Sequence, residues 1–287
     1  MREMEQVAPR PDRLSPGSNG YPQLLRQIDS PPDPLYVRGE LMPRDDAAVA
    51  IVGARTPTPY GVSMAEKIAG GLVQFGFTVV SGMARGIDTA AHRAVLRAGG
   101  RTVGVLGCGL DLDYPRGSVR LREQTALHGA LVTEFPEGTV PLPRNFPARN
   151  RIISGMSLAV VVVEAGRRSG SLITARWALD QGREVMAVPG RADCAMAEGP
   201  ITLIRDGAWP VTGAADVAEA LGIDFSGEDH TREETNPLLK ELAGGARLAE
   251  EMAAAAGWDI SRVLAELSRL EVEGLVSRET GGRYSLA

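Results

Sequence analysis

The chain has 287 residues, which is enough for one large domain and one small one, and its formal net charge of −5 argues at first sight against a nucleic-acid partner. Only 5% of the residues are aromatic, whereas glycine occurs 34 times, so we expect an aliphatic core with many tight turns. The N-terminus lacks the apolar core of a signal peptide, and the longest strictly apolar run, residues 158–163, is too short to cross a membrane. These properties predict a cytoplasmic protein that does not associate with membranes.

Charge is unevenly distributed along the chain. Residues 226–287 contain 12 acidic and 7 basic residues, so the excess negative charge belongs to this stretch and the first 225 residues are balanced. Within residues 144–191, eight arginines stand against three acidic residues. Because arginine forms forked contacts with phosphates and stacks on bases, a polyanionic partner stays open beside the alternative of a solvated, salt-bridged face.

The chain falls into four predicted parts. Residues 1–45 are proline-rich, and we expect an extended lead-in segment that packs on a domain. In residues 46–223, apolar runs alternate with helical patterns, which predicts an α/β domain with a Rossmann-like, doubly wound parallel sheet. The predicted strands are residues 48–53, 77–82, 102–107, 130–135, 158–164 and 184–190, and the predicted helices are residues 60–76, 88–100, 118–129 and 171–182.

The remaining two parts lie at the C-terminal end. Residues 224–236 are polar and acidic, as in a linker. Residues 237–287 show three helical pieces and two strand-like pieces around the turn ETGG, which predicts a small C-terminal winged-helix domain. Its net acidic charge favours protein contact or self-association over duplex DNA.

The loops that follow the predicted strands are the places to look for ligands, because doubly wound sheets bind at the carboxyl ends of their strands. These loops combine glycines, hydroxyls and arginines, but none carries a complete dinucleotide or Walker pattern. Several loops together favour a groove for an extended polyanion over a pocket for one nucleotide. The candidate residues in them are Gly53, Arg55, Arg85, Arg116, Arg168, Ser169, Gly170 and Ser171.

The segment PLPRNFPARNRIISG (residues 141–155) adds an aromatic residue to these cations. Arg144, Arg149 and Arg151 flank Phe146, just ahead of a predicted helix. Cations for the backbone and an aromatic ring for the bases are typical of proteins that bind single strands without sequence preference. Two alternatives stay open: Phe146 as an ordinary core residue, and Arg149 or Arg151 paired with a carboxylate such as Glu134 or Glu164.

Residues for catalysis or metal binding are poorly grouped. Glu164 at a strand end is a possible base, and Asp88 and His92 are four residues apart on one helix, where a cap and a structural histidine are the simpler interpretations. The two cysteines, Cys108 and Cys194, and the three histidines show no metal-ligand spacing. We predict no catalytic residues, no metal and no cofactor.

Several of these segments resemble the DNA-processing protein A family (DprA, also called Smf). They are VGARTPTPYG, SGMARGIDTAAHRAVL, LGCGLDLDYP, PRNFPARNRIISGMS and EAGRRSGSLITARWAL, in collinear order over about residues 20–210. The resemblance implies a non-enzymatic homodimer that binds and protects single-stranded DNA and loads the RecA recombinase onto it in natural transformation (competence) and recombination. It places Arg55, Arg144, Phe146, Arg168 and Ser169 in the DNA site.

The chain departs from the family at two points. The first 45 residues are too few for the helical N-terminal domain of many members, and the loop EGPITLIRDGA lacks the usual asparagine. Two other functions stay open. A nucleotide-acting enzyme similar to phosphoribohydrolases would need a PGG-x-GT-x-x-E loop, where this chain reads RRSGSLITA. A nucleotide sensor fits the anion-binding loop but leaves Arg144 and Phe146 without a role.

Overall fold

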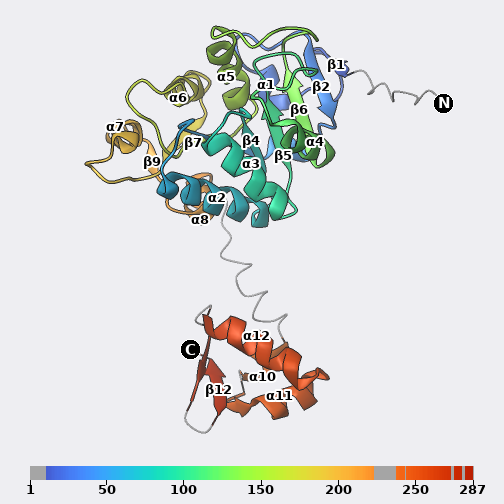
Figure 1. Cartoon of the computed structure of the whole chain (residues 1–287), viewed down its shortest axis with the longest axis vertical. Helices are drawn as coiled ribbons and strands as arrows, with labels where there is room; N and C mark the ends of the chain where they lie inside the picture. The colour runs from blue at the N-terminus through green and yellow to red at the C-terminus, as the bar shows by residue number, and fades with distance from the viewer. Residues whose placement is uncertain (1–10, 223–236, 243, 273–274, 280–281, 287) are drawn as a thin grey trace, which may run out of the picture. The chain divides into compact units, whose positions relative to one another are not determined.

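The computed structural model describes residues 11–222, 237–242, 244–272, 275–279 and 282–286. Contacts within the chain divide it into two compact units, Met1–Ile223 and Asp224–Ala287 (Figure 1). The predicted linker, residues 224–236, lies outside the described residues. Each unit is therefore described by itself.

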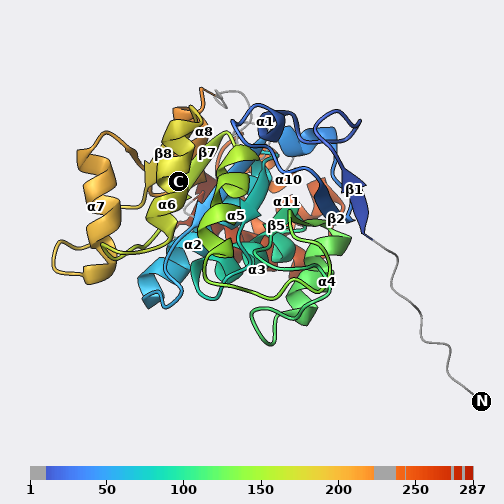
Figure 2. The ribbon, with the colours of Figure 1, turned by 90° about the horizontal axis from the view of Figure 1, so that it is seen from above.

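A nine-stranded sheet forms the centre of the first unit. Its strands are β1 (Asp12–Leu14), β2 (Leu35–Gly39), β3 (Ala48–Val52), β4 (Thr78–Ser81), β5 (Thr102–Val105), β6 (Gly129–Thr133), β7 (Ala159–Val162), β8 (Glu184–Ala187) and β9 (Trp209–Pro210), in the spatial order β1-β2-β6-β5-β4-β3-β7-β8-β9. The seven strands from β6 to β9 pair in parallel, whereas β2 pairs antiparallel with both β6 and β1. Figure 2 shows β1 and β2 at one margin of the unit.

Helices cover both faces of this sheet. The helices are α1 (Gln23–Arg26), α2 (Pro59–Gln74), α3 (Ile87–Arg97), α4 (Val119–Leu127), α5 (Asn145–Gly155), α6 (Ser171–Asp180), α7 (Glu198–Arg205) and α8 (Ala214–Ala220), with short 3-10 turns at Pro43–Asp46 and Ala195–Ala197. Helix α2 packs on α3 and α8, and α3 packs on α4, while α5 packs on α6 and α1. Figure 1 shows α5 and α6 on one side of the strands and α2, α3 and α8 on the other.

The predicted fold class is confirmed. All six predicted strands are present, within a few residues of the expected bounds, and every residue of β3 is buried. Such complete burial follows from the cover on both faces, and it explains why the strands are apolar along their whole length. Local signals agree with it: the Thr58 hydroxyl caps α2 by accepting a hydrogen bond from the Gly61 N–H at 3.2 Å.

Two segments differ from the sequence-based expectations. The lead-in contributes β1 and β2 to the sheet itself, with Leu35 and Val37 buried in the core. The segment 141–155 does not stand ahead of a helix, because α5 already begins at Asn145. Pro147 is compatible with this start, since proline lacks only an N–H that the first helical turn leaves without a partner.

The strand order reverses next to β3. From β3 the chain passes through β4 and β5 to β6 on one side, whereas β7, β8 and β9 follow on the other. The point between the carboxyl ends of β3 and β7 is therefore a topological switch point, where doubly wound sheets have their ligand crevice.

The second unit has the three predicted helices and the two predicted strands, together with a third, short strand that was not predicted. The helices are α10 (Pro237–Leu242), α11 (Ala249–Ala256) and α12 (Ile260–Val272), with a sheet of β10 (Arg247–Leu248), β12 (Arg283–Leu286) and β11 (Val276–Arg278) in that spatial order. Val263 and Leu267 of α12 are buried with Met252 and Tyr284. The apolar spacing of this helix in the sequence predicts a core position for Leu264 as well, but Leu264 is 43% exposed because it lies on the outer face of α12.

Candidate nucleic-acid interface

Two adjoining hollows, with cavity volumes of about 560 and 460 Å³, open at the carboxyl ends of the parallel strands. The first lies at the switch point and includes Gly53 and the loop residues Ser169, Gly170 and Ser171. The second includes Arg85 and Arg116. Both hollows are lined by Arg55, Ala84, Tyr114, Phe146 and Arg149, so they form one continuous depression, which we call the sheet-edge groove.

Close packing of two strand-end loops positions Arg55. Gly86, in the loop after β4, has a φ of +83°, and a Cβ at this position would collide with the carbonyl oxygen of Ala54 and the backbone of Arg55. Glycine is the residue that tolerates both the conformation and the approach. The loop after β4 thus supports the loop after β3, and Arg55 remains exposed above the groove.

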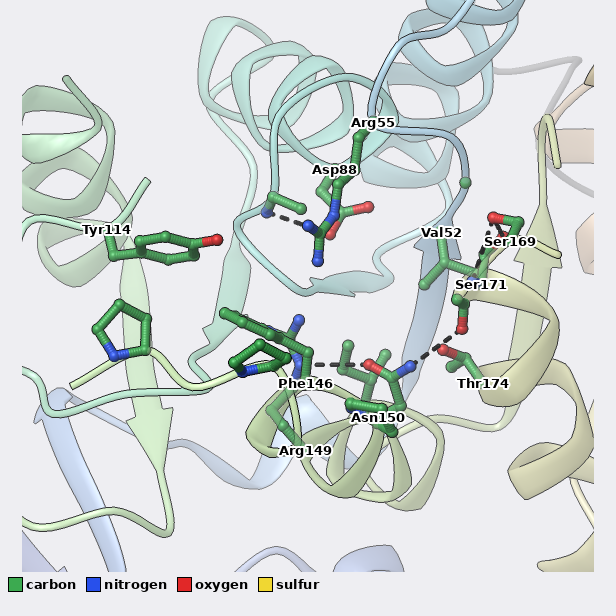
Figure 3. A pocket seen from close by; sticks show the side chains of 17 residues that line it. Val52, Arg55, Asp88, Tyr114, Phe146, Arg149, Asn150, Ser169, Ser171 and Thr174 are labelled. Atoms are coloured by element: carbon green, nitrogen blue, oxygen red, sulfur yellow. Dashed lines mark hydrogen bonds between the residues drawn. The ribbon is translucent and has the colours of Figure 1, made fainter. Parts of the chain in front are cut away.

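An aromatic pair lies at the centre of the groove. Phe146, from the first turn of α5, packs over Gly107, where an added Cβ would come within 2.8 Å of the ring. The Tyr114 ring centroid is 5.3 Å away at an interplanar angle of 31°, and the Arg55 guanidinium carbon is 5.3 Å from the Phe146 centroid. Figure 3 shows Arg55 pointing toward Phe146 from the opposite wall. Phe146 is only partly buried, so it is not an ordinary core residue.

Arg149 forms part of the floor of the groove. The residue is 4% exposed, and its guanidinium donates to the carbonyl oxygens of Gly82, at 2.7 Å, and Val105. Burial lowers the pKa of Arg149 to about 10, so the side chain is still charged at neutral pH. Arg149 therefore supplies positive potential and holds the floor of the groove, with Nη1 bonded to the backbone and Nε bonded to the Asn150 side-chain oxygen.

Asp88 lies beside Arg149 at the start of α3. Its carboxylate accepts hydrogen bonds from the backbone N–H groups of Gly82, at 3.1 Å, and Ala84, at 3.2 Å. Burial raises the pKa of Asp88 to about 6, while the Arg149 charge opposes this shift. Asp88 thus caps the loop that supports Arg55, as the simpler interpretation of its position expects.

The loop before α6 forms the other end of the groove. The hydroxyls of Ser169 and Ser171 are 2.7 Å apart, and the Asn150 amide donates to the carbonyl oxygen of Gly170 at 3.1 Å. This contact ties the loop to α5, one residue after Arg149. The N–H groups of Leu172 and Ile173 already donate to the carbonyl oxygens of Ser169 and Gly170, so what this end offers an anion is the positive end of the α6 dipole and the serine hydroxyls. Figure 3 shows Ser169 and Ser171 on the side of the groove away from Tyr114.

Arg151 is not part of the groove. Its guanidinium forms a two-pronged ion pair with Glu134, at 2.7 and 2.8 Å, and also donates to the carbonyl oxygen of Ser30. Since α5 is helical here, Arg149 and Arg151 point to different faces, and only Arg149 faces the groove. The carboxylate pairing that the sequence leaves open is realised for Arg151.

Arg144 and Arg168 line neither hollow but adjoin them. Arg144 stands immediately before α5 and next to Pro143, a lining residue of the first hollow. Arg168 immediately precedes Ser169. Both arginines are exposed, and within the described ranges neither has a carboxylate partner. They are available as cations at the rim of the groove.

The candidate acid–base residues are engaged in structural contacts. Glu164 accepts hydrogen bonds from the Thr58 N–H, at 2.8 Å, and the Thr58 hydroxyl, at 2.5 Å. His92 is fully buried with Nδ1 2.7 Å from Thr102 Oγ1, and burial, together with the Arg149 charge, lowers its pKa to about 3. Among the residues that the structure describes, no group of three His, Cys, Asp or Glu side chains is arranged to hold a metal ion.

Two groove residues were not singled out from the sequence. Tyr114 follows β5 in a quoted strand-end loop, so an aromatic ring at that position carried a usable signal. Asn150 is recognisable only once α5 is known to be helical, because it lies four residues after Phe146 on the same face.

Of the helices in the described ranges, none has the length and apolar character needed to span a membrane.

Fold and site together define a class: a Rossmann-like protein with an arginine- and aromatic-lined groove at its switch point, followed by a winged-helix unit. Residues 13–222 match the DNA recombination-mediator protein A family, and residues 226–282 match the DprA winged helix domain. The chain therefore belongs to the DNA recombination-mediator protein A family, which confirms the resemblance drawn from its motifs.

Relatives support this assignment. Protein Smf of Synechocystis sp. is 38% identical, over 96% of this chain and 80% of the relative. The crystal structure of DNA processing protein A from Streptococcus pneumoniae has a TM-score of 0.70 at 40% identity, covering 72% of this chain and 73% of that one. The protein from Helicobacter pylori, described for its unique single-stranded DNA binding mode, has a TM-score of 0.66 at 28% identity, covering 74% and 95%.

Proposed function

We propose that this protein binds single-stranded DNA along the sheet-edge groove. The observation that carries the proposal is the continuity of the two hollows through Arg55 and Phe146. A mononucleotide needs one hollow, whereas a strand uses several adjoining ones. Arg55, Arg85 and Arg116 are exposed in or beside this track and can meet successive phosphates.

The preference for a single strand rests on the aromatic pair. Bases stack on partly exposed rings such as Phe146 only when their faces are free, and in a duplex those faces are covered by neighbouring base pairs. The Helicobacter pylori relative, with the same fold, is described as a single-stranded DNA binder. Both observations favour an unpaired strand as the ligand.

A wider role follows from family membership. We propose that the protein protects incoming or processed single strands in the cytoplasm and loads the RecA recombinase onto them, in natural transformation and recombination. A homodimer formed through the first unit would present two grooves to one strand and gain avidity from their linkage. The family assignment over residues 13–222 supports this role.

Binding without catalysis is the better description of the groove. Glu164 and Asp88 accept hydrogen bonds that hold loops, and His92 is buried, so the acid–base candidates serve the fold. A nucleotide sensor is the second candidate, because a hollow of about 560 Å³ is large enough for a mononucleotide. A sensor would bind a mononucleotide as tightly as an oligonucleotide, whereas the groove predicts a large advantage for the oligonucleotide.

The double variant Arg55→Ala, Arg144→Ala tests the proposal. It removes one exposed guanidinium from the groove and one from its rim, so binding of a fluorescent oligo-dT should weaken at least about tenfold and the salt slope of log Kobs should shrink by about 1.4. Arg205→Ala, an exposed arginine on α7, is the matched control and should bind like the parent. Circular dichroism and light scattering check folding and oligomeric state. A double variant that binds like the parent would place the DNA elsewhere.

A further inference from the structure

A third hollow, with a cavity volume of about 590 Å³, lies between α3 and α4 and the loop before α4. We call it the α3–α4 channel. Its lining contains no acidic and no aromatic residue. The arginines that line it are Arg85, Arg93, Arg97, Arg116 and Arg120.

Among the residues that the structure describes, four of these five arginines have no ion-pair or hydrogen-bond partner. Arg97 pairs with Glu66 at 3.0 Å, but no ion pair or hydrogen bond engages the other four guanidiniums within the described part of the chain. Asp113, in the loop before α4, already accepts hydrogen bonds from the backbone N–H groups of Gly117 and Ser118, at 3.0 and 3.2 Å. Four like charges on one surface repel one another unless an anion lies between them. In a chain with a formal net charge of −5, such a surface indicates a polyanionic ligand.

The channel is continuous with the sheet-edge groove. Arg85, Pro115 and Arg116 line both the channel and the second hollow of the groove. A strand that passes Phe146 and reaches Arg116 is therefore already at the entrance of the channel. Arg93 on α3 and Arg120 on α4 are the two unpaired cations that belong to the channel alone.

The two surfaces differ in chemistry. The groove offers the rings of Phe146 and Tyr114 together with cations, whereas the channel offers guanidiniums and no ring. Guanidiniums without a stacking partner contact phosphates and ignore the bases. On the basis of the proposed function, we propose that a bound single strand continues from the groove into the α3–α4 channel, where Arg93 and Arg120 hold its sugar-phosphate backbone without contacting its bases.

Chemically extended oligonucleotides test this directly. A dT oligomer of about six nucleotides, a short site size, serves as the core, and about six further units are added at its 5′ or its 3′ end. We expect an abasic sugar-phosphate extension at one of the two ends to tighten binding as much as a dT extension does. An uncharged methylphosphonate extension at that end should give no gain. The proposal is overturned if neither end gains, or if the uncharged extension gains equally.

The double variant Arg93→Ala, Arg120→Ala identifies the surface. It should bind the core oligomer like the parent but lose the gain in affinity from the extension. For the extended oligomer, the salt slope of log Kobs should be smaller than that of the parent by about 1.4. Arg93→Lys, Arg120→Lys should restore most of that gain, and Arg205→Ala should leave it intact. Equal losses on core and extended oligomers would overturn the assignment.

The same measurements separate this inference from the proposed function. If the parent binds no oligomer, the proposed function fails. If the parent binds the core through Arg55 and gains nothing from any extension, only the α3–α4 channel is excluded from the binding track.

Discussion

Replacing Phe146 with leucine removes the aromatic face from the sheet-edge groove but keeps an apolar side chain over Gly107. Stacking of one base on an aromatic side chain contributes about 1–3 kcal/mol, so the affinity for oligo-dT should fall by about 5- to 150-fold. The loss of the Tyr114 contact costs at most about 1.5 kcal/mol of stability. The variant should therefore remain folded.

Fluorescence anisotropy with two ligands isolates the stacking contribution. Oligo-dT and an abasic oligomer of equal length carry the same phosphates, so Phe146→Leu should weaken binding of the first and leave binding of the second unchanged. Tyr114→Leu, which removes the neighbouring ring, should act in the same direction. If Phe146→Leu weakens both ligands equally, or weakens neither, Phe146 does not stack on a base and the role assigned to it is refuted.

Three further predictions concern the residues around the groove. Arg149→Ala removes a buried charge that holds two carbonyl oxygens and faces Asp88, so urea unfolding should show a loss of about 3–5 kcal/mol; an unchanged midpoint would contradict this role. Arg151→Ala breaks the ion pair with Glu134 and should lower the melting temperature while leaving oligo-dT affinity within about twofold, and a larger loss of affinity would return Arg151 to the groove. Burial lowers the folded-state pKa of His92 to about 3, so the unfolded state takes up the proton first and stability is lost as the pH falls from 6.5 toward 3. Asp88, whose pKa is raised to about 6, contributes the opposite slope, because its folded state takes up the proton first. His92→Gln should therefore make the loss of stability with falling pH shallower than in the parent, as measured by urea titrations between pH 7 and 4. An equally steep loss in the variant would contradict the role of His92.

The sheet was predictable because its central strands are buried on both faces. Runs such as residues 48–53 carry no polar residue, and a parallel sheet between helices is the arrangement that buries them. The edge of the sheet formed by β1 and β2 was not predictable in the same way. Strand β2 is five residues long, with only Leu35 and Val37 buried, and it follows a proline-rich stretch.

The start of helix α5 was predicted too late for a related reason. Pro143 and Pro147 lie on either side of residues 144–146 and favour a loop there. Pro147 nevertheless falls in the first turn of α5, where a proline costs little helix stability. Once the helix is known, its period separates the two arginines that the sequence treats alike: Arg149 faces inward and Arg151 pairs with Glu134.

Convergence of the loop residues was predictable from topology. The carboxyl ends of parallel strands meet at one edge of the sheet, so Gly53, Arg55, Arg85 and Phe146 line one groove although 93 positions separate the first and last of them in the numbering. The burial of Arg149 was not predictable, because it depends on the backbone carbonyls of Gly82, just after β4, and Val105 of β5, which no local pattern reveals.

The most direct measurement compares oligo-dT with a duplex of equal length by fluorescence anisotropy, at two salt concentrations. Partly exposed rings at the centre of a cationic groove predict that the single strand binds much more tightly than the duplex, and that its affinity falls steeply as salt rises. Equal affinity for the duplex would contradict single-strand recognition by the groove.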